Sequence, residues 1–280
     1  MLHKDYYAWS SACIAGEEDE ARPIYGAADA AALGRALAQL AAPLMRVLLI
    51  ALLALAPLVH ADNQLTPWTS GPPAGEWSAP WRLADIPKLK PSARSLVEQE
   101  GRMVLRIEAD TAAGGLLHPL DLPGDRPWQL SWQWRSERRL EQARFATREG
   151  DDYAARVYVL LDYPLASLPF LTRQKLRLAR TFYDPQLPAA TLSYVWDNRV
   201  ASGTHARSAY SETVEMLVLR GPEAPLGQWL EERRDLRADA IAAFGSAPRR
   251  ILGVVFAADS DNTGERVESY FAEPQLRVEP

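Results

Sequence analysis

The chain has one cysteine and four histidines in 280 residues, and these shortages exclude several classes of site. The single cysteine, Cys13, precedes a predicted leader, so the mature protein would have no thiol nucleophile, disulfide or cysteine-based zinc site. Only His118 and His205 follow that leader, which excludes a site built from several histidines. No glycine-rich phosphate loop is present. The formal net charge is −5, without the basic clusters of nucleic-acid binders, so we expect no nucleic-acid partner.

Residues 45–61 read as a bacterial secretory signal peptide that lies inside the chain. Arg46 supplies the positive region, Val47 to Leu55 the apolar core, and Ala61 ends a small-residue cleavage site. The simplest interpretation is that residues 1–44 are a mis-called N-terminal extension. The alternative is a cytoplasmic extension followed by a signal anchor, but the apolar run is shorter than the roughly 20 residues that span a bilayer. We therefore predict a periplasmic or secreted protein with no transmembrane segment after cleavage.

The mature chain reads as an arm, residues 62–91, followed by one β domain, residues 92–280. Between Trp128 and Trp134, apolar and polar residues alternate with the period of a strand that buries one face. The other predicted strands are Met103–Glu108, Tyr153–Leu161, Leu192–Trp196, Thr213–Leu219, Ile251–Ala257 and Val267–Val278.

Two helices interrupt this series of strands. Leu165–Phe182 is basic and amphipathic, and Leu236–Phe244 is short and ends before Gly245, a natural C-cap. Many strands with few helices predict an all-β fold, a jelly-roll-like β-sandwich of the galactose-binding or lectin kind.

Five blocks of the sequence stand out together. They are Leu130-Ser-Trp-Gln-Trp134, Gly150-Asp-Asp-Tyr-Ala-Ala-Arg-Val-Tyr158, Leu192-Ser-Tyr-Val-Trp196, Trp229 with Asp239 and Phe244-Gly245, and Asp259-Ser-Asp-Asn-Thr-Gly264. Their order and spacing resemble a family of exported bacterial proteins known as a domain of unknown function. The resemblance covers most of residues 81–278 and implies an exported β domain, but it transfers no catalytic residue.

The block after Gly150 places two carboxylates at the mouth of an apolar strand that contains Arg156. A charge in such a strand is costly unless it is paired. One interpretation is a structural ion pair. The other is a polar cleft in which Asp151, Asp152 and Arg156 bind a ligand on which Tyr194 or Trp196 stacks.

The loop from Asp259 to Gly264 has oxygen ligands at alternate positions, as in the first half of a calcium loop. Asp259, Asp261 and Asn262 are therefore the candidate metal ligands, and calcium is the one possible cofactor. Thr263 at position five and Tyr270 at position twelve depart from the pattern. The alternative is a polar turn whose aspartates bond backbone amides.

Tryptophans are frequent, and they carry two interpretations. Trp132 and Trp134 share the apolar face of one strand and are predicted to lie in the core. Trp68, Trp77 and Trp81 lie in the less regular arm, where they either stack on sugars or close the sandwich.

The leading hypothesis is an exported, non-catalytic domain that binds carbohydrate or another cell-envelope ligand. The first alternative is a glycoside hydrolase or lyase in which Glu231 or Glu232 pairs with Asp152 or Asp259. The second is an envelope assembly component that works through the basic helix and its loop.

Overall fold

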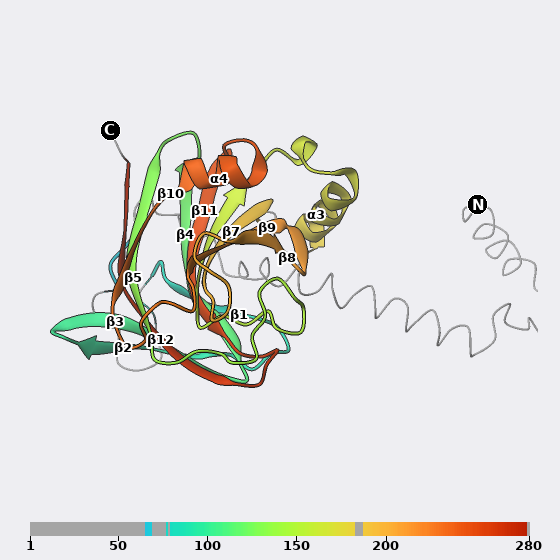
Figure 1. Cartoon of the computed structure of the whole chain (residues 1–280). Helices are drawn as coiled ribbons and strands as arrows, with labels where there is room; N and C mark the ends of the chain where they lie inside the picture. The colour runs from blue at the N-terminus through green and yellow to red at the C-terminus, as the bar shows by residue number, and fades with distance from the viewer. Residues whose placement is uncertain (1–64, 69–76, 78, 183–186, 279–280) are drawn as a thin grey trace, which may run out of the picture. The chain divides into compact units, whose positions relative to one another are not determined.

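The computed structural model describes residues 65–68, 77, 79–182 and 187–278, which form two sheets packed face to face (Figure 1). The larger sheet has the order β1 (Arg82–Asp85), β4 (Ala113–Pro123), β11 (Arg250–Asp259), β6 (Ala155–Asp162), β7 (Ala190–Trp196), β9 (Ser211–Arg220) and β8 (His205–Ser208). The smaller has the order β10 (Leu230–Asp235), β5 (Trp128–Ser136), β12 (Arg266–Val278), β3 (Arg102–Asp110) and β2 (Ala93–Gln99).

Neighbouring strands run antiparallel except β7 and β9, which are parallel. This architecture confirms the predicted all-β sandwich. The predicted extension, residues 1–44, and the predicted signal peptide, residues 45–61, lie outside the described residues.

The core lies between the two sheets and is rich in aromatic rings. Trp132 and Trp134 face inward as predicted, and their ring centroids are 5.5 Å apart. Phe256 of β11 and Phe271 of β12 meet across the two sheets with centroids 5.4 Å apart and near-perpendicular rings. Such edge-to-face pairs add to the burial of apolar area as a source of stability.

The described part of the arm belongs to the sandwich. Trp68 and Trp81 are 2% and 4% exposed, and both rings pack against Phe256. Trp68 and Trp81 therefore close the sandwich, which is one of the two roles predicted for the arm tryptophans. They offer no surface to a sugar. Trp77 is partly buried against the same core.

Strand β4 was not among the predicted strands, although it lies between β1 and β11 and is buried on both faces. Its sequence contains two glycines and Pro119, which argue against a central strand. In the structure, the glycines and Pro119 each have a role in β4. A Cβ on Gly115 would lie 2.5 Å from the carbonyl oxygen of Phe256, and Pro119 is placed where the pairing with β11 shifts register at Gly253.

The two predicted helices are present, one with a break. Leu165–Ser167 forms a 3-10 turn, η2, and after Pro169 the chain continues as α3 (Phe170–Phe182). The second helix, α4 (Leu236–Phe244), is capped by the side chain of Asp235 and ends at Gly245 with a φ of 79°. Among the described residues, no helix is long and apolar enough to cross a membrane.

Candidate functional site

The residues predicted to bind a ligand lie on two opposite faces of the larger sheet. On β6, side chains alternate, so that Val157 and Val159 enter the core whereas Arg156 points to the outer face. On β7, Tyr194 and Trp196 enter the core and are 0% and 2% exposed.

The prediction that Tyr194 or Trp196 stacks on a ligand bound at Arg156 is therefore wrong. Adjacent residues of a strand face opposite ways, and Arg156 is paired across the sheet with Val195, which separates Tyr194 from Trp196 in the sequence. The Tyr194 hydroxyl instead donates a hydrogen bond of 2.6 Å to Asp239. Burial raises the pKa of Tyr194.

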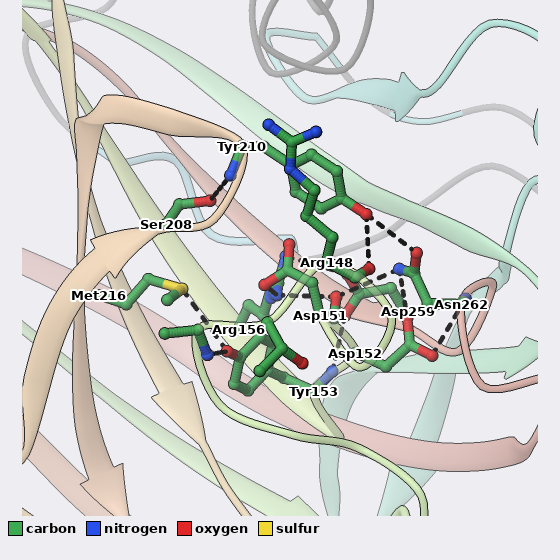
Figure 2. Close-up of polar contacts among 12 residues, drawn as sticks. Arg148, Asp151, Asp152, Tyr153, Arg156, Ser208, Tyr210, Met216, Asp259 and Asn262 are labelled. Atoms are coloured by element: carbon green, nitrogen blue, oxygen red, sulfur yellow. Dashed lines mark hydrogen bonds and ion pairs between the residues drawn. The ribbon is translucent and has the colours of Figure 1, made fainter. Parts of the chain in front are cut away.

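Arg156 is the centre of a buried ion-pair cluster (Figure 2). Its guanidinium lies 3.2 Å from a carboxylate oxygen of Asp151 and 2.9 Å from one of Asp259. It also donates to the Tyr158 hydroxyl, and its carbon lies 4.1 Å from the ring centroid of Tyr153. Burial lowers the pKa of Arg156, but Asp259, Tyr158 and Asp151 outweigh it and hold that pKa well above its ordinary value.

The two predicted acidic blocks meet in space, through Asp152. Its carboxylate accepts hydrogen bonds from the backbone amides of Asn262 and Thr263, at 3.1 and 2.6 Å, and from the side chain of Asn262. The backbone amide of Tyr153 in turn donates to Asp259, at 3.0 Å. The loop after β11 is thus tied to the segment before β6 by bonds between residues more than a hundred positions apart (Figure 2).

Asp152, Asp259 and Asp261 each offer an oxygen within 4.8 Å of the others, the arrangement that a cation would need. These carboxylates are already engaged within the chain. Asp259 is paired with Arg156, and Asp152 accepts backbone amides. These bonds match the alternative interpretation, a turn held by its aspartates. Calcium binding by Asp259, Asp261 and Asn262 stays a prediction.

A small hollow opens beside this cluster on the outer face of the larger sheet. Its polar lining includes Arg156, Asp261 and Asn262 together with Ser208 and Tyr210. The cavity volume is about 70 Å³. That is room for a few water molecules, but it is far below the roughly 300–1,000 Å³ of ordinary small-molecule sites. The ligand-binding role predicted for Asp151, Asp152 and Arg156 remains a prediction, limited by this size to a small polar group.

A larger groove lies on the outer face of the smaller sheet, which the sequence did not single out. Its volume is about 420 Å³. Gln133 and Ser131 of β5 form the middle of its floor, and their neighbours across the sheet face the same way. Gln133 lies opposite Glu231 and Ala272, and Ser131 lies opposite Arg233 and Gln275. The lining is Arg102, Met103, Ser131, Trp132, Gln133, Glu231, Arg233, Ala272 and Gln275.

The groove lies over an irregularity in β12, where the register with β5 shifts between Ala272 and Gln275. Bulges of this kind bend a strand and redirect its side chains, and they are frequent beside functional sites. At one end, the guanidinium of Arg102 lies 4.4 Å from the ring centroid of Trp229 and donates to the Gln133 side chain at 2.7 Å. This end of the groove is therefore held in place before any ligand arrives.

The carboxylates proposed for hydrolysis do not share a hollow. Glu231 lines the groove of the smaller sheet, whereas Asp259 lines the small hollow of the larger sheet. Glu232 points inward, is 8% exposed, accepts a hydrogen bond from the Trp134 indole and pairs with Arg220. Burial raises the pKa of Glu232, against the effect of Arg220. The described structure brings neither glutamate together with Asp152 or Asp259.

Several solved structures resemble the chain at low similarity. A family 11 carbohydrate-binding module of a Clostridium thermocellum cellulosomal cellulase has a TM-score of 0.36 and 8% identity, covering 79% of this chain and 97% of the module. A family 30 module from the same organism has a TM-score of 0.33 and 13% identity, over 78% and 95%. A cleaved adhesin domain of Lys-gingipain from Porphyromonas gingivalis has a TM-score of 0.33 and 13% identity, over 78% and 100%.

These scores are too low to transfer a ligand or an activity to this chain. No curated protein matches the chain in sequence. The model of one family, DUF3047, described as a protein of unknown function, matches residues 79–275 and so spans most of the sandwich. The resemblance to a domain of unknown function is thereby confirmed, and the chain belongs to the DUF3047 family.

Proposed function

We propose that the protein binds carbohydrate, without cleaving it, in the groove on the outer face of the smaller sheet. The observation that carries this proposal is the polar lining of a groove of about 420 Å³, within the usual range of small-molecule sites. Small-molecule sites in general are lined mainly by hydrophobic and aromatic side chains. This groove instead presents two side-chain amides, a hydroxyl, a carboxylate and two guanidinium groups.

Sugar hydroxyls both donate and accept hydrogen bonds, so a sugar site needs both kinds of partner at short spacing. Gln133 and Gln275 each carry a donor and an acceptor, Arg233 only donates, and Glu231 only accepts. These four residues come from three adjacent strands, β10, β5 and β12, whose spacing of about 4.8 Å places their side chains within reach of one ring. Because these residues lie on paired strands, no loop has to be ordered when a ligand binds.

Binding without cleavage is favoured by the acidic content of the groove. Glycosidases generally use two carboxyl groups about 5–10 Å apart across the scissile bond. Glu231 is the one carboxylate among the described residues that line the groove. The alternative, a hydrolase or lyase on the same scaffold, requires a second carboxylate facing Glu231.

The proposed place of action is the periplasm or the outside of the cell. This part of the proposal rests on residues 45–61 of the sequence alone. Amino-terminal sequencing of the native protein tests it, with Asp62 expected as the first residue. A native protein that begins at Met1 and is recovered from the cytosol would contradict it.

A glycan array probed with the purified protein tests the sugar-binding proposal. We expect a defined set of glycans to bind, and we expect Arg233→Ala to weaken binding to every one of them. Arg237→Ala is the matched control, because Arg237 is also an exposed arginine but lies on α4 outside the groove. Released reducing sugar in the same samples would favour the hydrolase, and no binding by the wild-type protein would reject the proposal.

A further inference from the structure

Helix α3 exposes apolar side chains to solvent, which is the reverse of an ordinary surface helix. Phe170, Leu171 and Leu178 are 62%, 70% and 61% exposed, the three largest values among the exposed large hydrophobic residues of the described chain. Leu171 and Leu178 are seven positions apart and so lie on one side of the helix. Phe170 lies about 100° from Leu171 on the same side, with the exposed Gln174 between Phe170 and Leu178. Leu176, on another side, is partly buried against the core.

Cations flank this exposed apolar side. Lys175 and Arg177 are both exposed, and α3 contains no acidic residue from Phe170 to Phe182. Successive helix positions are about 100° apart, so Lys175 lies beyond Leu171 on one side and Arg177 lies beyond Phe170 on the other. Within the described residues, neither cation forms an ion pair with an aspartate or glutamate.

A third basic residue fixes the helix to the sandwich. Arg180 pairs with Asp162 of β6 at 3.1 Å and donates to the carbonyl of Leu187 at 2.6 and 3.0 Å. The helix is therefore held from one side while its apolar side faces away from the sheets, and Figure 1 shows α3 beside the larger sheet.

We propose that α3 docks on the surface of a bilayer that contains anionic phospholipid. Phe170, Leu171 and Leu178 would enter the boundary between headgroups and acyl chains, while Lys175 and Arg177 would contact the lipid phosphates. An apolar strip flanked by lysine and arginine is the pattern of helices that lie in the membrane interface. The 13 residues of α3 are about 20 Å long, too short to span the hydrocarbon core.

The basic residues of α3, as well as its exposed apolar side chains, point to an anionic bilayer as the surface that the helix contacts. A protein partner would need an apolar groove with acidic rims on both sides, whereas an anionic bilayer presents acyl chains beneath a layer of phosphates everywhere. Basic residues close to such a surface each contribute about 1 kcal/mol to binding. One short helix with two exposed cations, Lys175 and Arg177, gives weak, reversible attachment. This docking is independent of the sugar groove, which lies on the smaller sheet.

A fluorescent probe at one helix position tests the docking without interference from the apolar leader. In the full chain carrying Cys13→Ser, Leu171→Cys is labelled with the polarity-sensitive dye NBD. Emission is followed on adding vesicles of phosphatidylcholine alone, or vesicles in which roughly one third of the lipid is phosphatidylglycerol. A second label at Leu83→Cys, an exposed leucine on β1, reports a surface outside α3.

We expect a blue shift at position 171 with the anionic vesicles, no shift with phosphatidylcholine alone, and no shift at position 83. Lys175→Glu with Arg177→Glu should weaken the apparent affinity at least roughly 30-fold, from about 1 kcal/mol for each charge removed. Arg138→Glu with Arg237→Glu changes the net charge equally at exposed sites outside α3 and should leave the affinity near that of the parent. Unchanged circular dichroism and melting temperature would show that each variant is folded.

Three results would overturn the proposal. The first is no shift at position 171 with the anionic vesicles. The second is an equal shift at position 83, which would place the contact outside α3. The third is equal loss of affinity in the two charge variants, which would mean that net charge rather than α3 attracts the lipid.

Discussion

Replacing Arg156 by methionine should lower the free energy of unfolding by about 3–5 kcal/mol, the usual cost of leaving a buried charge without its partner. Arg156 is 5% exposed, and its partners Asp151 and Asp259 are each 8% exposed. At separations of 2.9 and 3.2 Å, each attraction is worth about 5 kcal/mol at an effective dielectric constant of about 20. The desolvation of three charges offsets most of that sum in the wild-type protein, but Arg156→Met retains the desolvated carboxylates and loses the attraction.

Chemical denaturation in urea at neutral pH measures this loss. Adding Asp151→Asn and Asp259→Asn to Arg156→Met should recover most of the stability, because no uncompensated charge is then buried. Arg148→Met is the matched control, since Arg148 is exposed, donates to the carbonyl of Ala209 and contacts the Tyr210 ring, with no ion pair to a carboxylate among the described residues. We expect it to cost less than about 1 kcal/mol.

The same variant should show a pH dependence of predictable sign. Burial raises the pKa of Asp151 and of Asp259, against the opposing charge of Arg156. Removing Arg156 raises both pKa values further. As the pH falls, Asp151 and Asp259 are therefore protonated at a higher pH in the variant than in the wild-type protein, and their protonation removes the uncompensated buried charge. The stability difference should be fully present above the raised pKa values of the variant and should shrink as the pH falls through them. A loss below about 1 kcal/mol at neutral pH, or a loss independent of pH, would refute the ion-pair account.

Three further outcomes follow from the fold. Because Asp259 is already paired with Arg156, millimolar calcium should leave the melting temperature unchanged relative to chelator, and a rise of several degrees would establish a site at Asp259 and Asp261. Gly115→Ala should cost about 1–3 kcal/mol in urea denaturation, since the new Cβ meets a carbonyl of β11; an unchanged midpoint would show that β4 can move. Asp235→Ala should cost about 1 kcal/mol, because two backbone amides of α4 lose their acceptor; no loss would mean that water replaces the cap.

The sequence predicts the strands that alternate clearly and misses those that do not. Trp128–Trp134 corresponds to β5 because its polar and apolar residues alternate without exception. The segment of β4 has no such alternation, since both of its faces are buried and its glycines and proline serve close approach and a register shift. Short edge strands such as β1 and β8, of four residues each, carry too few positions for a period to be recognised.

The sequence showed which charged residues belong to the candidate site, but it did not show which face of the sheet each residue occupies. An arginine inside an apolar strand predicted an ion pair with a carboxylate, but the structure was needed to show that Asp151 and Asp259 are its partners. Whether Tyr194 shares that face depends on the register between β6 and β7, which a single sequence does not contain. The groove depends likewise on which strands lie beside β5. Its polar residues Ser131 and Gln133 were visible as one face of a strand, while β10 and β12 join them only in the folded sheet.

Sugar binding in the groove can be measured by calorimetric titration of the strongest glycan on the array against three proteins. The wild type is compared with Gln133→Ala/Gln275→Ala in the groove and with Asn262→Ala in the small hollow of the larger sheet. We expect the groove variant to bind at least about tenfold more weakly, as two hydrogen-bonding side chains are lost, and Asn262→Ala to bind as the wild type does. Unchanged affinity in the groove variant, or loss of binding in Asn262→Ala, would contradict sugar binding on the smaller sheet.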